Sequence, residues 1–600
     1  MAFFVIKNLY SLSIKSTMNI IGISCFYHDA SACLLQEGSL VSAAQEERFT
    51  RIKHDKSFPE NAIKFCLESN QLSISDIDLI VFYEKPFVKF DRIINTLQNQ
   101  APFTFNLFRK TLLSWLKTKL WVSSIIKDAL DYNGEIIYSE HHESHAAGSF
   151  YTSPFKEAVI VTTDGVGEKA CTTIALGKEN NVSILKEQHY PHSIGLLYSA
   201  FTQYCGFKVN SGEYKLMGLA PYGKPLYKQL ILDHIVSYDE TGLVTLNLDC
   251  FSFEKGESTI NSKFCDVFGK PKRGLDDEMS DFYSDIASSI QSVTEDVVLQ
   301  VLKHAKEITG VDNLCLSGGV ALNCKANGEL LGKNLFKHIW VQPASGDAGC
   351  SVGAAYVGWY HHLKNKRIYL NDDLNSQVYL GSEYDNSSVE SVLKQFQLNY
   401  TKYTDEELCE IVASHLDNKQ IIGWFQGKME FGPRALGHRS ILASPLFEDM
   451  KKHVNLNIKF REGFRPFAPI VLEEDSSDWF NMEGINSKYM LFTVKSLMKS
   501  KIPSCIHEDS TARVQTLNRD ENPLLHQLIC QFKHKTDCPV LINTSFNVRG
   551  EPIVESPIDA LKCFFYTKMD VLVLGNFVLT KPENKTVHSD LIITKSYELD

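Results

Sequence analysis

Four short clusters along the chain contain residue types that bind metal ions. They are His141-His142-Glu143-Ser144-His145, Asp164-Gly165, Ser317-Gly318-Gly319 and Ser345-Gly346-Asp347-Ala348-Gly349. Residues four positions apart share one face of a helix, so His141 and His145 can reach one ion while His142 points elsewhere. Two neutral imidazoles with two carboxylates suit Fe(II), Mn(II), Zn(II) or Mg(II). The clusters therefore predict a metal site made of His141, His145, Asp164 and Asp347.

The alternative is a helix N-terminus whose histidines hold no ligand. The histidine pair alone leaves both interpretations open. Asp164 and Asp347, each expected at a junction between a strand and a turn, favour the metal site. The motif His-Glu-x-x-His is absent, which excludes a zincin-type protease.

His28 and Asp29 follow the first apolar run and form a second candidate for chemistry. A histidine at the end of a buried strand can act as a general base or bind a reacting group. It can also be a turn residue whose side chain bonds to nearby backbone. The sequence leaves both interpretations open.

Basic residues in the second half of the chain lie in loops rich in glycine, proline and apolar residues. The loops are Gly432 to Ser440, Lys459 to Pro469, Thr511 to Arg513 and Asn543 to Gly550. An arginine in such a loop needs an anion, because its charge is otherwise poorly solvated. Structural pairs with carboxylates could explain one or two of these loops but hardly all. We predict an internal pocket for phosphate or carboxylate groups.

The segment from Gly218 to Lys224 imitates a phosphate-binding P-loop without matching it. Pro225 stands where the Mg²⁺-binding Ser or Thr belongs, and Pro221 interrupts the loop. Lys215 and the glycines around it remain candidates for the lining of a nucleotide pocket.

Composition sets the broad class of the protein. A chain of 600 residues predicts two or more domains, and 44% hydrophobic with 22% charged residues is ordinary for a globular protein. The formal net charge of −11 argues against a protein that binds the DNA backbone, while small anions need only a local basic pocket.

The cysteines and the start of the chain bear on its compartment. The 15 cysteines form no C-x-x-C pair, and an odd number fits a disulfide framework poorly, so we expect reduced thiols in a cytoplasmic protein. No apolar run approaches the length of a membrane span. The first 17 residues show no clear signal-peptide cleavage site, and Met18 could be the true start.

The pattern of apolar runs predicts an α/β first domain of two related halves. A meander of strands at 19–25, 32–36 and 40–45 opens the chain, and strands at 158–163 and 313–316 restart the pattern. Helices are expected at 59–68, 195–203 and around 286–297. Ligands in such folds lie in a crevice at the strand ends.

Two further segments complete the organisation. Residues 87–130 show helical spacing at Phe108, Leu112, Leu113 and Leu116, which predicts a helical insertion covering the core. Contact with a membrane surface is a second interpretation. The polar stretch at 364–388 divides a domain of residues 19–363 from one of residues 375–600, whose first expected elements are a helix at 405–416 and a strand at 420–425.

Nine motifs in chain order resemble the carbamoyltransferase family of NodU/CmcH type, which includes nodulation-factor, cephalosporin and tobramycin O-carbamoyltransferases. They are GISCFYHDASACLL, HHESHAAGSFYTSPF, TTDGVGE, GEYKLMGLAPYG, LSGGVALNCKAN, PASGDAGCSVGAA, GKMEFGPRALGHRS, NIKFREGFRPFAP and NTSFNVRGEPIVESP. The resemblance runs from about Ile20 to the mid-570s. Each motif is modest, but nine in order are highly specific.

The resemblance implies a fold and an activity. The first domain would have the actin/sugar-kinase-like (ASKHA) fold found in the ATPase of tRNA threonylcarbamoyladenosine synthesis, and the second a YrdC-like α/β fold. Carbamoyl phosphate and ATP would give carbamoyl-adenylate, phosphate and pyrophosphate in the second domain. The carbamoyl group would then pass to an acceptor hydroxyl at the metal site of the first domain.

The resemblance also implies roles for individual residues. His141, His145, Asp164 and Asp347 would hold the metal, expected to be Fe(II), with Mg(II) accompanying ATP. His28, next to Asp29, would contact the carbamoyl group or help deprotonate the acceptor. Gly318, Gly319 and Asn323, with Lys215, would line the nucleotide cleft of the first domain. Lys459, Arg465, Arg513 and Arg549 would bind carbamoyl phosphate and the nucleotide phosphates.

The function expected from these patterns is ATP-dependent O-carbamoyl transfer to a small-molecule hydroxyl, with no nucleic-acid or membrane partner. A threonylcarbamoyl enzyme that modifies tRNA is the alternative, but the acidic balance and the lack of a basic face count against it. A non-enzymatic scaffold would not need the metal quartet or the arginine loops. The acceptor is not named by any residue pattern, and the grounds for expecting a homodimer are weak.

Overall fold

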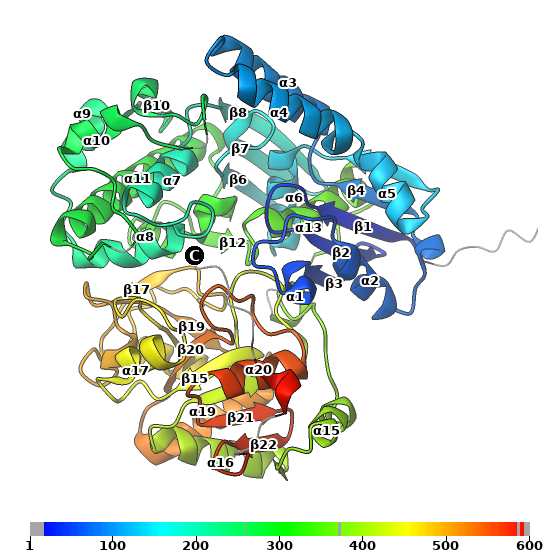
Figure 1. Cartoon of the computed structure of the whole chain (residues 1–600), viewed down its shortest axis with the longest axis vertical. Helices are drawn as coiled ribbons and strands as arrows, with labels where there is room; N and C mark the ends of the chain where they lie inside the picture. Colours follow the sequence, from blue (N-terminus) through cyan, green and yellow to red (C-terminus); the bar gives the residue numbers. More distant parts are fainter. Residues whose placement is uncertain (1–16, 257, 276, 370–373, 585–587, 593–600) are drawn as a thin grey trace, which may run out of the picture.

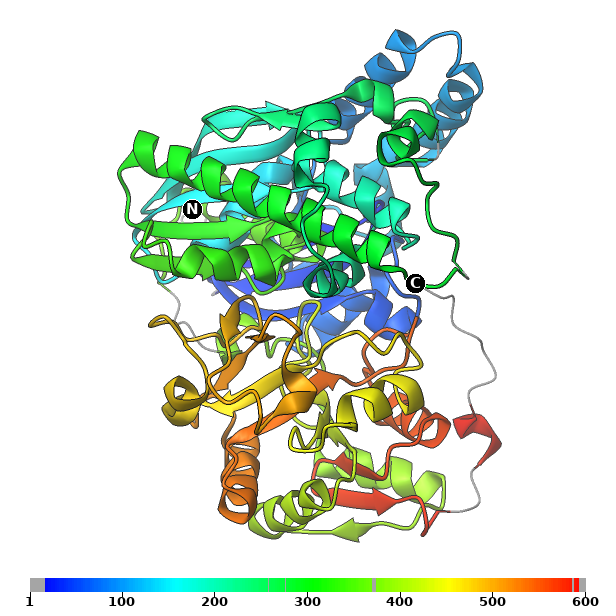
Figure 2. The ribbon, with the colours of Figure 1, turned by 90° about the vertical axis from the view of Figure 1, so that its left-hand side faces the viewer.

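The computed structural model describes residues 17–256, 258–275, 277–369, 374–584 and 588–592. An N-terminal region fills the upper part of Figure 1 and a C-terminal region the lower part. Figure 2 shows the same division from the side. The segment before Met18 lies almost wholly outside the described residues.

The N-terminal region contains two five-stranded sheets with the same topology. The first is ordered β3-β2-β1-β4-β5 and the second β8-β7-β6-β11-β12. In each sheet three sequential strands form an antiparallel meander. A fourth strand pairs in parallel with the first strand of the meander, and a fifth pairs in parallel with the fourth. The strands are β1 (Asn19–Ser24), β2 (Ser31–Gln36), β3 (Ser39–Gln45), β4 (Leu79–Phe82), β5 (Glu135–Tyr138), β6 (Glu157–Thr163), β7 (Ala170–Lys178), β8 (Asn181–His189), β11 (Asn313–Ser317) and β12 (His338–Val341). The prediction of an α/β domain built from two related halves is confirmed.

Two central helices pack against each other between the sheets. Helix α6 (His141–Thr152) follows β5, and α13 (Cys350–Tyr356) follows β12, so the two helices hold equivalent places in the two halves. They approach so closely that a Cβ at Gly353 would lie 1.7 Å from the carbonyl oxygen of Ser144. Because only glycine fits there, the N-termini of both helices are fixed side by side.

Other helices of the N-terminal region pack on these sheets or on one another. They are α1 (Glu47–Thr50), α2 (Glu60–Glu68), α7 (Ile194–Tyr204), α8 (Glu213–Leu219), α9 (Lys228–His234), α10 (Ser262–Phe268), α11 (Asp281–Thr309) and α12 (Cys324–Leu331), with a short ribbon of β9 (Val236–Tyr238) and β10 (Val244–Leu246). The long helix α11 buries Ile286, Ile290, Val293 and Val297 on one face, as its spacing predicts.

The predicted insertion is helical, but only part of it covers the core. It consists of α3 (Pro86–Asn99), α4 (Phe105–Ser114), a π-helical turn (Trp115–Lys119) and α5 (Val122–Leu130). Val122 and Ile126 of α5 join the main apolar core. Leu113 and Leu116 remain 53% and 47% exposed, so the expectation that the whole segment covers the core is wrong for α4.

The C-terminal region is built on one mixed sheet of eight strands, ordered β13-β22-β21-β14-β15-β20-β16-β19. The strands are β13 (Thr401–Lys402), β14 (Ile422–Phe425), β15 (Arg439–Ala443), β16 (Ala468–Leu472), β19 (Gln515–Leu517), β20 (Val540–Ser545), β21 (Val571–Leu574) and β22 (Phe577–Thr580), beside a ribbon of β17 (Thr493–Lys495) and β18 (Thr511–Arg513). The helices are α14 (Leu374–Gln377), α15 (Asn386–Gln395), α16 (Asp405–Asp417), α17 (Met450–Asn457), α18 (Ser476–Trp479), α19 (Pro523–Thr536) and α20 (Pro557–Tyr566). The predicted first elements are confirmed as α16 and β14, whereas α15 lies partly in the stretch that shows no periodicity.

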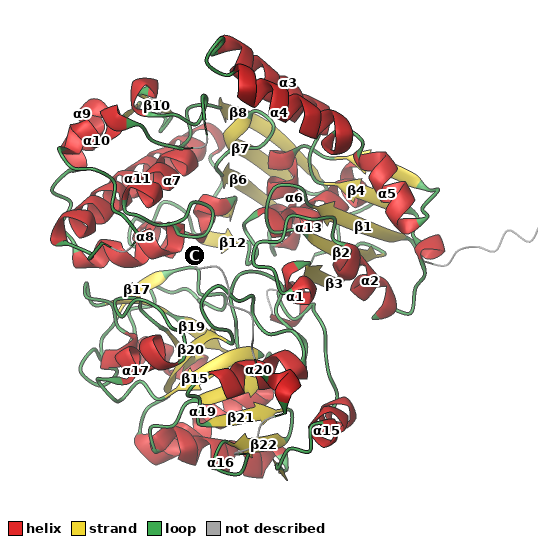
Figure 3. Ribbon diagram, viewed as in Figure 1, coloured by secondary structure: helices red, strands yellow, loops and turns green. Residues whose placement is uncertain are grey.

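The two regions share apolar contacts. Val378, Tyr379, Phe431 and Leu436 belong to the same buried cluster as the core of the N-terminal region. Across the seam, a guanidinium nitrogen of Arg48 donates to the carbonyl oxygen of Gly432 at 2.8 Å. Loops make up much of the rim that the C-terminal region turns toward this seam (Figure 3).

The state of the cysteines and the apolarity of the helices can be compared with the expectations from sequence. All 15 cysteines are free thiols, and most are buried, in agreement with the sequence. Among the described residues, none of the helices combines the length and apolarity that crossing a bilayer demands.

Candidate functional site

The four predicted metal ligands come together in the N-terminal region. The Nε2 atoms of His141 and His145 are 3.1 Å apart, and an oxygen of Asp164 lies 3.1 Å from the first and 3.7 Å from the second. An oxygen of Asp347 lies 3.9 Å from each Nε2. These four donor atoms lie within 4.8 Å of one another.

The donor set fits a divalent cation. The side chain of Asp347 is only 1% exposed, and neither of its carboxylate oxygens has a hydrogen-bond partner among the described residues. A buried carboxylate without a partner is unfavourable unless a cation neutralises it. Two imidazoles and two carboxylates meeting at one point are what Fe(II), Mn(II) or Zn(II) would require.

The topology explains why ligands so far apart in sequence meet. His141 and His145 lie in the first turns of α6, and Asp347 begins the 3₁₀ turn that leads into α13. The expectation that Asp347 follows a strand directly is therefore wrong, because β12 ends at Val341. Since α6 and α13 hold equivalent places in the two halves, their N-termini converge on one point. Asp164 joins them from the turn after β6.

Two glycines hold Asp164 in place. Gly318 has a φ of +92°, and a Cβ on it would lie 2.2 Å from the carbonyl oxygen of Thr163. The N–H of Gly319 donates to a carboxylate oxygen of Asp164 at 3.2 Å. The predicted glycine pair therefore lies directly against Asp164 of the metal quartet.

Neighbouring groups orient the histidines and set their charge. Nδ1 of His145 lies 3.3 Å from the hydroxyl of Ser317, and Glu168 accepts from the backbone N–H of His141 at 3.0 Å. Burial disfavours the charged form of His141, but the charge of Asp347 and the hydrogen bond with Asp164 outweigh it and raise its pKa to about 9. Burial also opposes ionisation of Asp164, yet its hydrogen bonds to the two histidines hold its pKa well below the usual range. A bound cation would displace the proton that His141 otherwise holds.

His28 and Asp29 lie beside this quartet. Nε2 of His28 is 3.8 Å from an oxygen of Asp347, and its Nδ1 is 3.1 Å from an oxygen of Asp29. The other oxygen of Asp29 lies 2.7 Å from Nδ1 of His54. Burial disfavours the charged form of His28, but the charge of Asp347 and the hydrogen bond with Asp29 raise its pKa to about 10. The His28–Asp29 turn between β1 and β2 is the counterpart of the Asp164 turn between β6 and β7.

A second charged cluster lies where the C-terminal region meets α8. Its centre is Glu462, whose oxygens lie 3.5 Å from Arg465, 3.6 Å from Arg549 and 3.9 Å from Lys215. The guanidinium of Arg465 lies 4.8 Å from the ring centre of Tyr214 in α8. Three of the predicted anion ligands, Arg465, Arg513 and Arg549, belong to this cluster together with Lys215.

Two arginines not selected from the sequence complete the cluster. Burial and then the charge of Arg513 lower the pKa of Arg434 to about 9, and burial and the charge of Arg465 hold that of Arg461 well below its usual range. Within the part of the chain that the structure describes, neither Arg434, Arg461 nor Arg513 forms an ion pair with a carboxylate. These three arginines are half-buried, and an excess of positive charge in such a setting is what an anion would stabilise.

Glu430 shapes the loop that carries Arg434. One of its carboxylate oxygens accepts backbone N–H groups of Leu436, His438 and Arg439 at 2.8, 2.8 and 3.1 Å. Glu430 is 2% exposed, so these bonds fix the loop from inside. The motif GKMEFGPRALGHRS could have drawn attention to Arg434, but no spacing rule singles out which of its arginines faces a ligand.

Lys459 has a different setting from the arginines. Its ammonium donates to the carbonyl oxygens of Ser545 and Asn547 at 2.7 and 2.8 Å and to the side-chain oxygen of Asn547 at 2.5 Å. Three protein acceptors already use the three donors of the ammonium group. Its predicted role in binding carbamoyl phosphate stays a prediction, and its visible contacts hold the loop after β20.

The residues predicted to bind nucleotide lie in three settings. Gly318 and Gly319 contact the metal quartet, and Lys215 contacts Glu462. The side chain of Asn323 accepts from the N–H of Ala326 at the start of α12 and exchanges two hydrogen bonds with Gln291. That side chain is fully engaged in capping α12.

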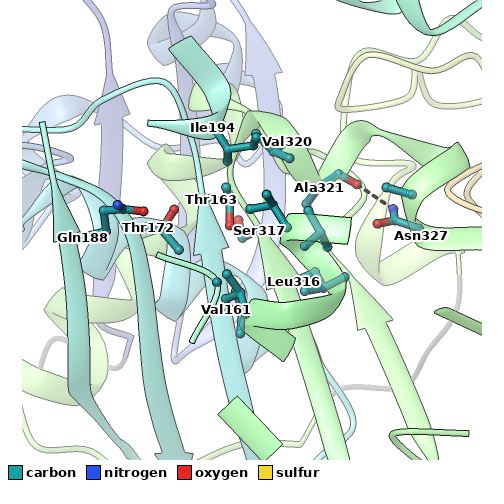
Figure 4. A pocket seen from close by; sticks show the side chains of 15 residues that line it. Val161, Thr163, Thr172, Gln188, Ile194, Leu316, Ser317, Val320, Ala321 and Asn327 are labelled. Atoms are coloured by element: carbon teal, nitrogen blue, oxygen red, sulfur yellow. Dashed lines mark hydrogen bonds between the residues drawn. The ribbon is translucent and has the colours of Figure 1, made fainter. Parts of the chain in front are cut away.

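A void beneath the second sheet lies next to this region (Figure 4). Val161, Thr163, Leu316 and Ser317 line it from β6 and β11, and Ala321 accepts a hydrogen bond from Asn327 at its edge. Its volume is about 20 Å³. This is room for about one water molecule and too little for a nucleotide.

Comparison with known proteins identifies the family. The model of the carbamoyltransferase N-terminus matches residues 19–356, and that of the carbamoyltransferase C-terminus matches residues 413–581. The chain is 46% identical to the Synechocystis sp. protein sll1178, over 97% of this chain and 100% of that protein. It is 34% identical to nodulation protein NolNO of Sinorhizobium fredii, over 93% of this chain and 79% of that protein.

The solved structures are more distant. Full-length HypF in its phosphate- and nucleotide-bound form is 12% identical, with a TM-score of 0.30, over 57% of this chain and 55% of that chain. A likeness at this level supports no conclusion about this chain. The two family models and the relatives that match over most of the chain identify the family. The chain belongs to the carbamoyltransferase family and is a carbamoyltransferase.

Proposed function

We propose that the protein is an ATP-dependent O-carbamoyltransferase that forms carbamoyl-adenylate in its C-terminal region and transfers the carbamoyl group to a small-molecule hydroxyl at the quartet of the N-terminal region. The observation that carries the proposal is the cluster around Glu462, where Arg434, Arg461 and Arg513 form no ion pair with any carboxylate in the described part of the chain. Family membership shows carbamoyl transfer; the two oppositely built clusters support a reaction in two steps.

The arginine cluster supports the adenylation step. Carbamoyl phosphate is hydrolysed to carbamate and phosphate, and a carbamate oxygen then attacks the α-phosphorus of ATP and displaces pyrophosphate. Both departing groups gain negative charge. Arg465, Arg513 and Arg549, joined by Arg434 and Arg461, would neutralise that charge as it develops. Mg(II) would accompany the nucleotide phosphates.

The quartet supports the transfer step. A cation held by His141, His145, Asp164 and Asp347, for which we propose Fe(II), would polarise the carbamoyl carbonyl. The acceptor oxygen attacks the carbamoyl carbon and AMP leaves. Nε2 of His28 would take the acceptor proton once a cation neutralises Asp347, because the charge of Asp347 is what chiefly raises the pKa of His28, while Asp29 holds its Nδ1. His141, His145 and Asp347 are each only 1% exposed, and such burial would help to keep water from the carbamoyl group.

The finer fold assignment is part of the proposal. The matching strand order of the two N-terminal sheets supports an ASKHA-type domain over residues 19–363. The mixed sheet of the C-terminal region is proposed to be YrdC-like, over residues 375–600. Val378 and Tyr379 belong to the apolar cluster that spans both regions, so packing alone draws no sharp boundary between them.

The experiment is pyrophosphate release from ATP, measured with and without carbamoyl phosphate and without an acceptor. We expect release that requires carbamoyl phosphate and that falls at least about a hundredfold in Arg465→Ala. Arg519→Ala, an exposed arginine of the same region, is the matched control and should behave as wild type.

Release that proceeds equally without carbamoyl phosphate would contradict the proposal. So would Arg465→Ala acting like wild type. If a threonylcarbamoyl enzyme were the correct assignment, release would instead require threonine and bicarbonate, and the protein would bind tRNA.

A further inference from the structure

The insertion between β4 and β5 carries an unusual surface. Nearly a third of the exposed large apolar side chains of the described residues lie between residues 87 and 121. These side chains lie on α3, on α4, in the turn between the two helices and in the segment after α4. They are Phe87, Val88, Phe103, Phe105, Leu113, Leu116 and Trp121, with Phe103 85% and Phe105 68% exposed.

The geometry of α4 separates a packed face from an exposed one. Trp115 is 6% exposed and lies 5.6 Å from the ring of Phe90, and Phe108 and Leu112 are half-buried beside it. On the opposite face, Phe105, Arg109 and Leu113 follow one another at a spacing of four and are all exposed. Helix α4 therefore has a packed apolar face and an exposed face on which Phe105 and Leu113 flank Arg109.

The exposed face is accompanied by unbalanced positive charge. Between Asp91 and Asp128 the sequence contains no acidic residue, although the whole chain has a net charge of −11. Arg109, Lys110 and Lys117 are exposed, and none of them pairs with a carboxylate among the described residues. The basic residues of this segment are Arg92, Arg109, Lys110, Lys117, Lys119 and Lys127.

We propose that the α3–α4 hairpin docks the enzyme on the surface of an anionic lipid membrane. Aromatic and leucine side chains enter the boundary between headgroups and acyl chains, while lysine and arginine contact anionic headgroups. The indole N–H of Trp121 already donates to the carbonyl oxygen of Leu116 at 2.6 Å, so its ring is free to face an apolar phase. This inference departs from the expectation of no membrane partner.

The charge pattern favours this occupant over a second copy of the chain. A twofold contact would place the patch against itself and bring like charges together. The place of the hairpin also suits docking, because α3 and α4 lie at the periphery of the N-terminal region, away from the C-terminal region (Figures 1 and 2).

The hairpin is also connected to the quartet. The N–H of Lys85, just before α3, donates to the Glu168 carboxylate that accepts the N–H of His141. From that base to the tip, α3 extends roughly 20 Å. A docked enzyme would hold its transfer site close to the membrane.

Flotation of the full-length protein with vesicles tests the proposal. One set contains phosphatidylcholine alone, and the other has about a quarter of it replaced by phosphatidylglycerol. We expect binding to the anionic vesicles alone and release as salt is raised. Arg109→Gln/Lys110→Gln/Lys117→Gln should bind on the order of a hundredfold more weakly, because each basic residue near the surface contributes about fivefold.

Phe103→Ser/Phe105→Ser tests the apolar part, and Leu243→Ser/Leu275→Ser, two exposed leucines elsewhere in the same region, is the matched control. We expect the phenylalanine variant to lose binding and the leucine variant to keep it. Carbamoyl-phosphate-dependent pyrophosphate release should stay unchanged in both and reports an intact fold. No binding to anionic vesicles, equal binding to neutral ones, or a dimer in sedimentation that only the phenylalanine variant breaks would overturn the proposal.

Discussion

The two charged clusters of this carbamoyltransferase are built in opposite ways. Around the quartet, two imidazoles face two carboxylates, and Asp347 has oxygens with no hydrogen-bond partner. Around Glu462, cations outnumber carboxylates, and the pKa of Arg434 falls to about 9 because of burial and the charge of Arg513. This contrast in charge favours a cation at the first cluster and an anion at the second, in line with the proposed function.

The difference extends to the way each cluster is held. The quartet depends on helix N-termini and on glycines that allow no other residue, all within one region of the chain. The arginine cluster depends on loops and on α8 of the other region, so it straddles the seam. Changes that remove cation binding should therefore spare anion chemistry, and the reverse should also hold.

The largest effect should come from removing a ligand of the quartet. His145→Ala should lower metal affinity by at least about two orders of magnitude, because the three remaining donors leave the cation incompletely coordinated. Metal content after desalting measures this, while carbamoyl-phosphate-dependent pyrophosphate release should continue. His142→Gln, on the neighbouring face of α6, is the control and should keep its metal. Unchanged metal content in His145→Ala would show that His145 is not a ligand.

The next effect concerns the opposite cluster. Arg434→Lys should reduce pyrophosphate release about a hundredfold, since lysine cannot reproduce the planar set of donors that arginine offers a phosphate. Metal content should stay at the wild-type level. A variant that releases pyrophosphate normally would show that Arg434 only packs in the seam. Arg519→Lys, the same exchange at an exposed arginine, is the control and should behave as wild type.

Much of the quartet can be predicted from the sequence, and the reasons are local. The spacing of His141 and His145 places both on one face of a helix, and Asp164 ends an apolar run. Asp347 is harder, because its approach depends on two sheets with the same strand order bringing α6 and α13 together. The residues around Asp347 in the sequence do not indicate that α6 and α13 lie side by side.

The arginine cluster was predictable as a class of site but not residue by residue. The glycine- and proline-rich loops predict charged side chains in a confined setting. The conformation of the loop that carries Arg434 depends on Glu430, which accepts three of its backbone N–H groups, and no spacing rule predicts that contact. Lys459 looks like a phosphate ligand in sequence, whereas its ammonium bonds to Ser545 and Asn547. The exposed face of α4 was missed because helical spacing cannot say which face of a helix is covered.

A substitution at Gly318 tests whether the backbone beside Asp164 constrains the quartet. Gly318→Ala should destabilise the fold by about 2–4 kcal/mol, because a Cβ would collide with Thr163 at a positive φ. Thermal unfolding measures the loss, and weaker metal binding should accompany it, since Asp164 rests on this turn. Gly332→Ala, where a Cβ meets nothing within 4 Å, is the control; equal stability of the two variants would contradict the assigned constraint.

The smallest effect is a pH dependence of the loop that carries Arg434. Burial lowers the pKa of His438 to about 4, from an ordinary value of 6.5. As pH falls from 6.5 toward 4, the unfolded chain takes up this proton first, so stability is lost across that window and is fully present above it. His438→Gln should flatten part of the decline in denaturant unfolding, and His507, with a similar shift, leaves the remainder. An identical pH profile in the variant would rule out this contribution.

The apolar cluster shared by the two regions constrains how a reactive intermediate travels. Opening the seam would expose Phe431 and Leu436, at a cost of about 25 cal/mol for each Å² of apolar surface uncovered. A large hinge rotation between adenylation and transfer is therefore unfavourable. The proposed carbamoyl-adenylate would instead have to pass between two reaction centres whose separation stays nearly fixed.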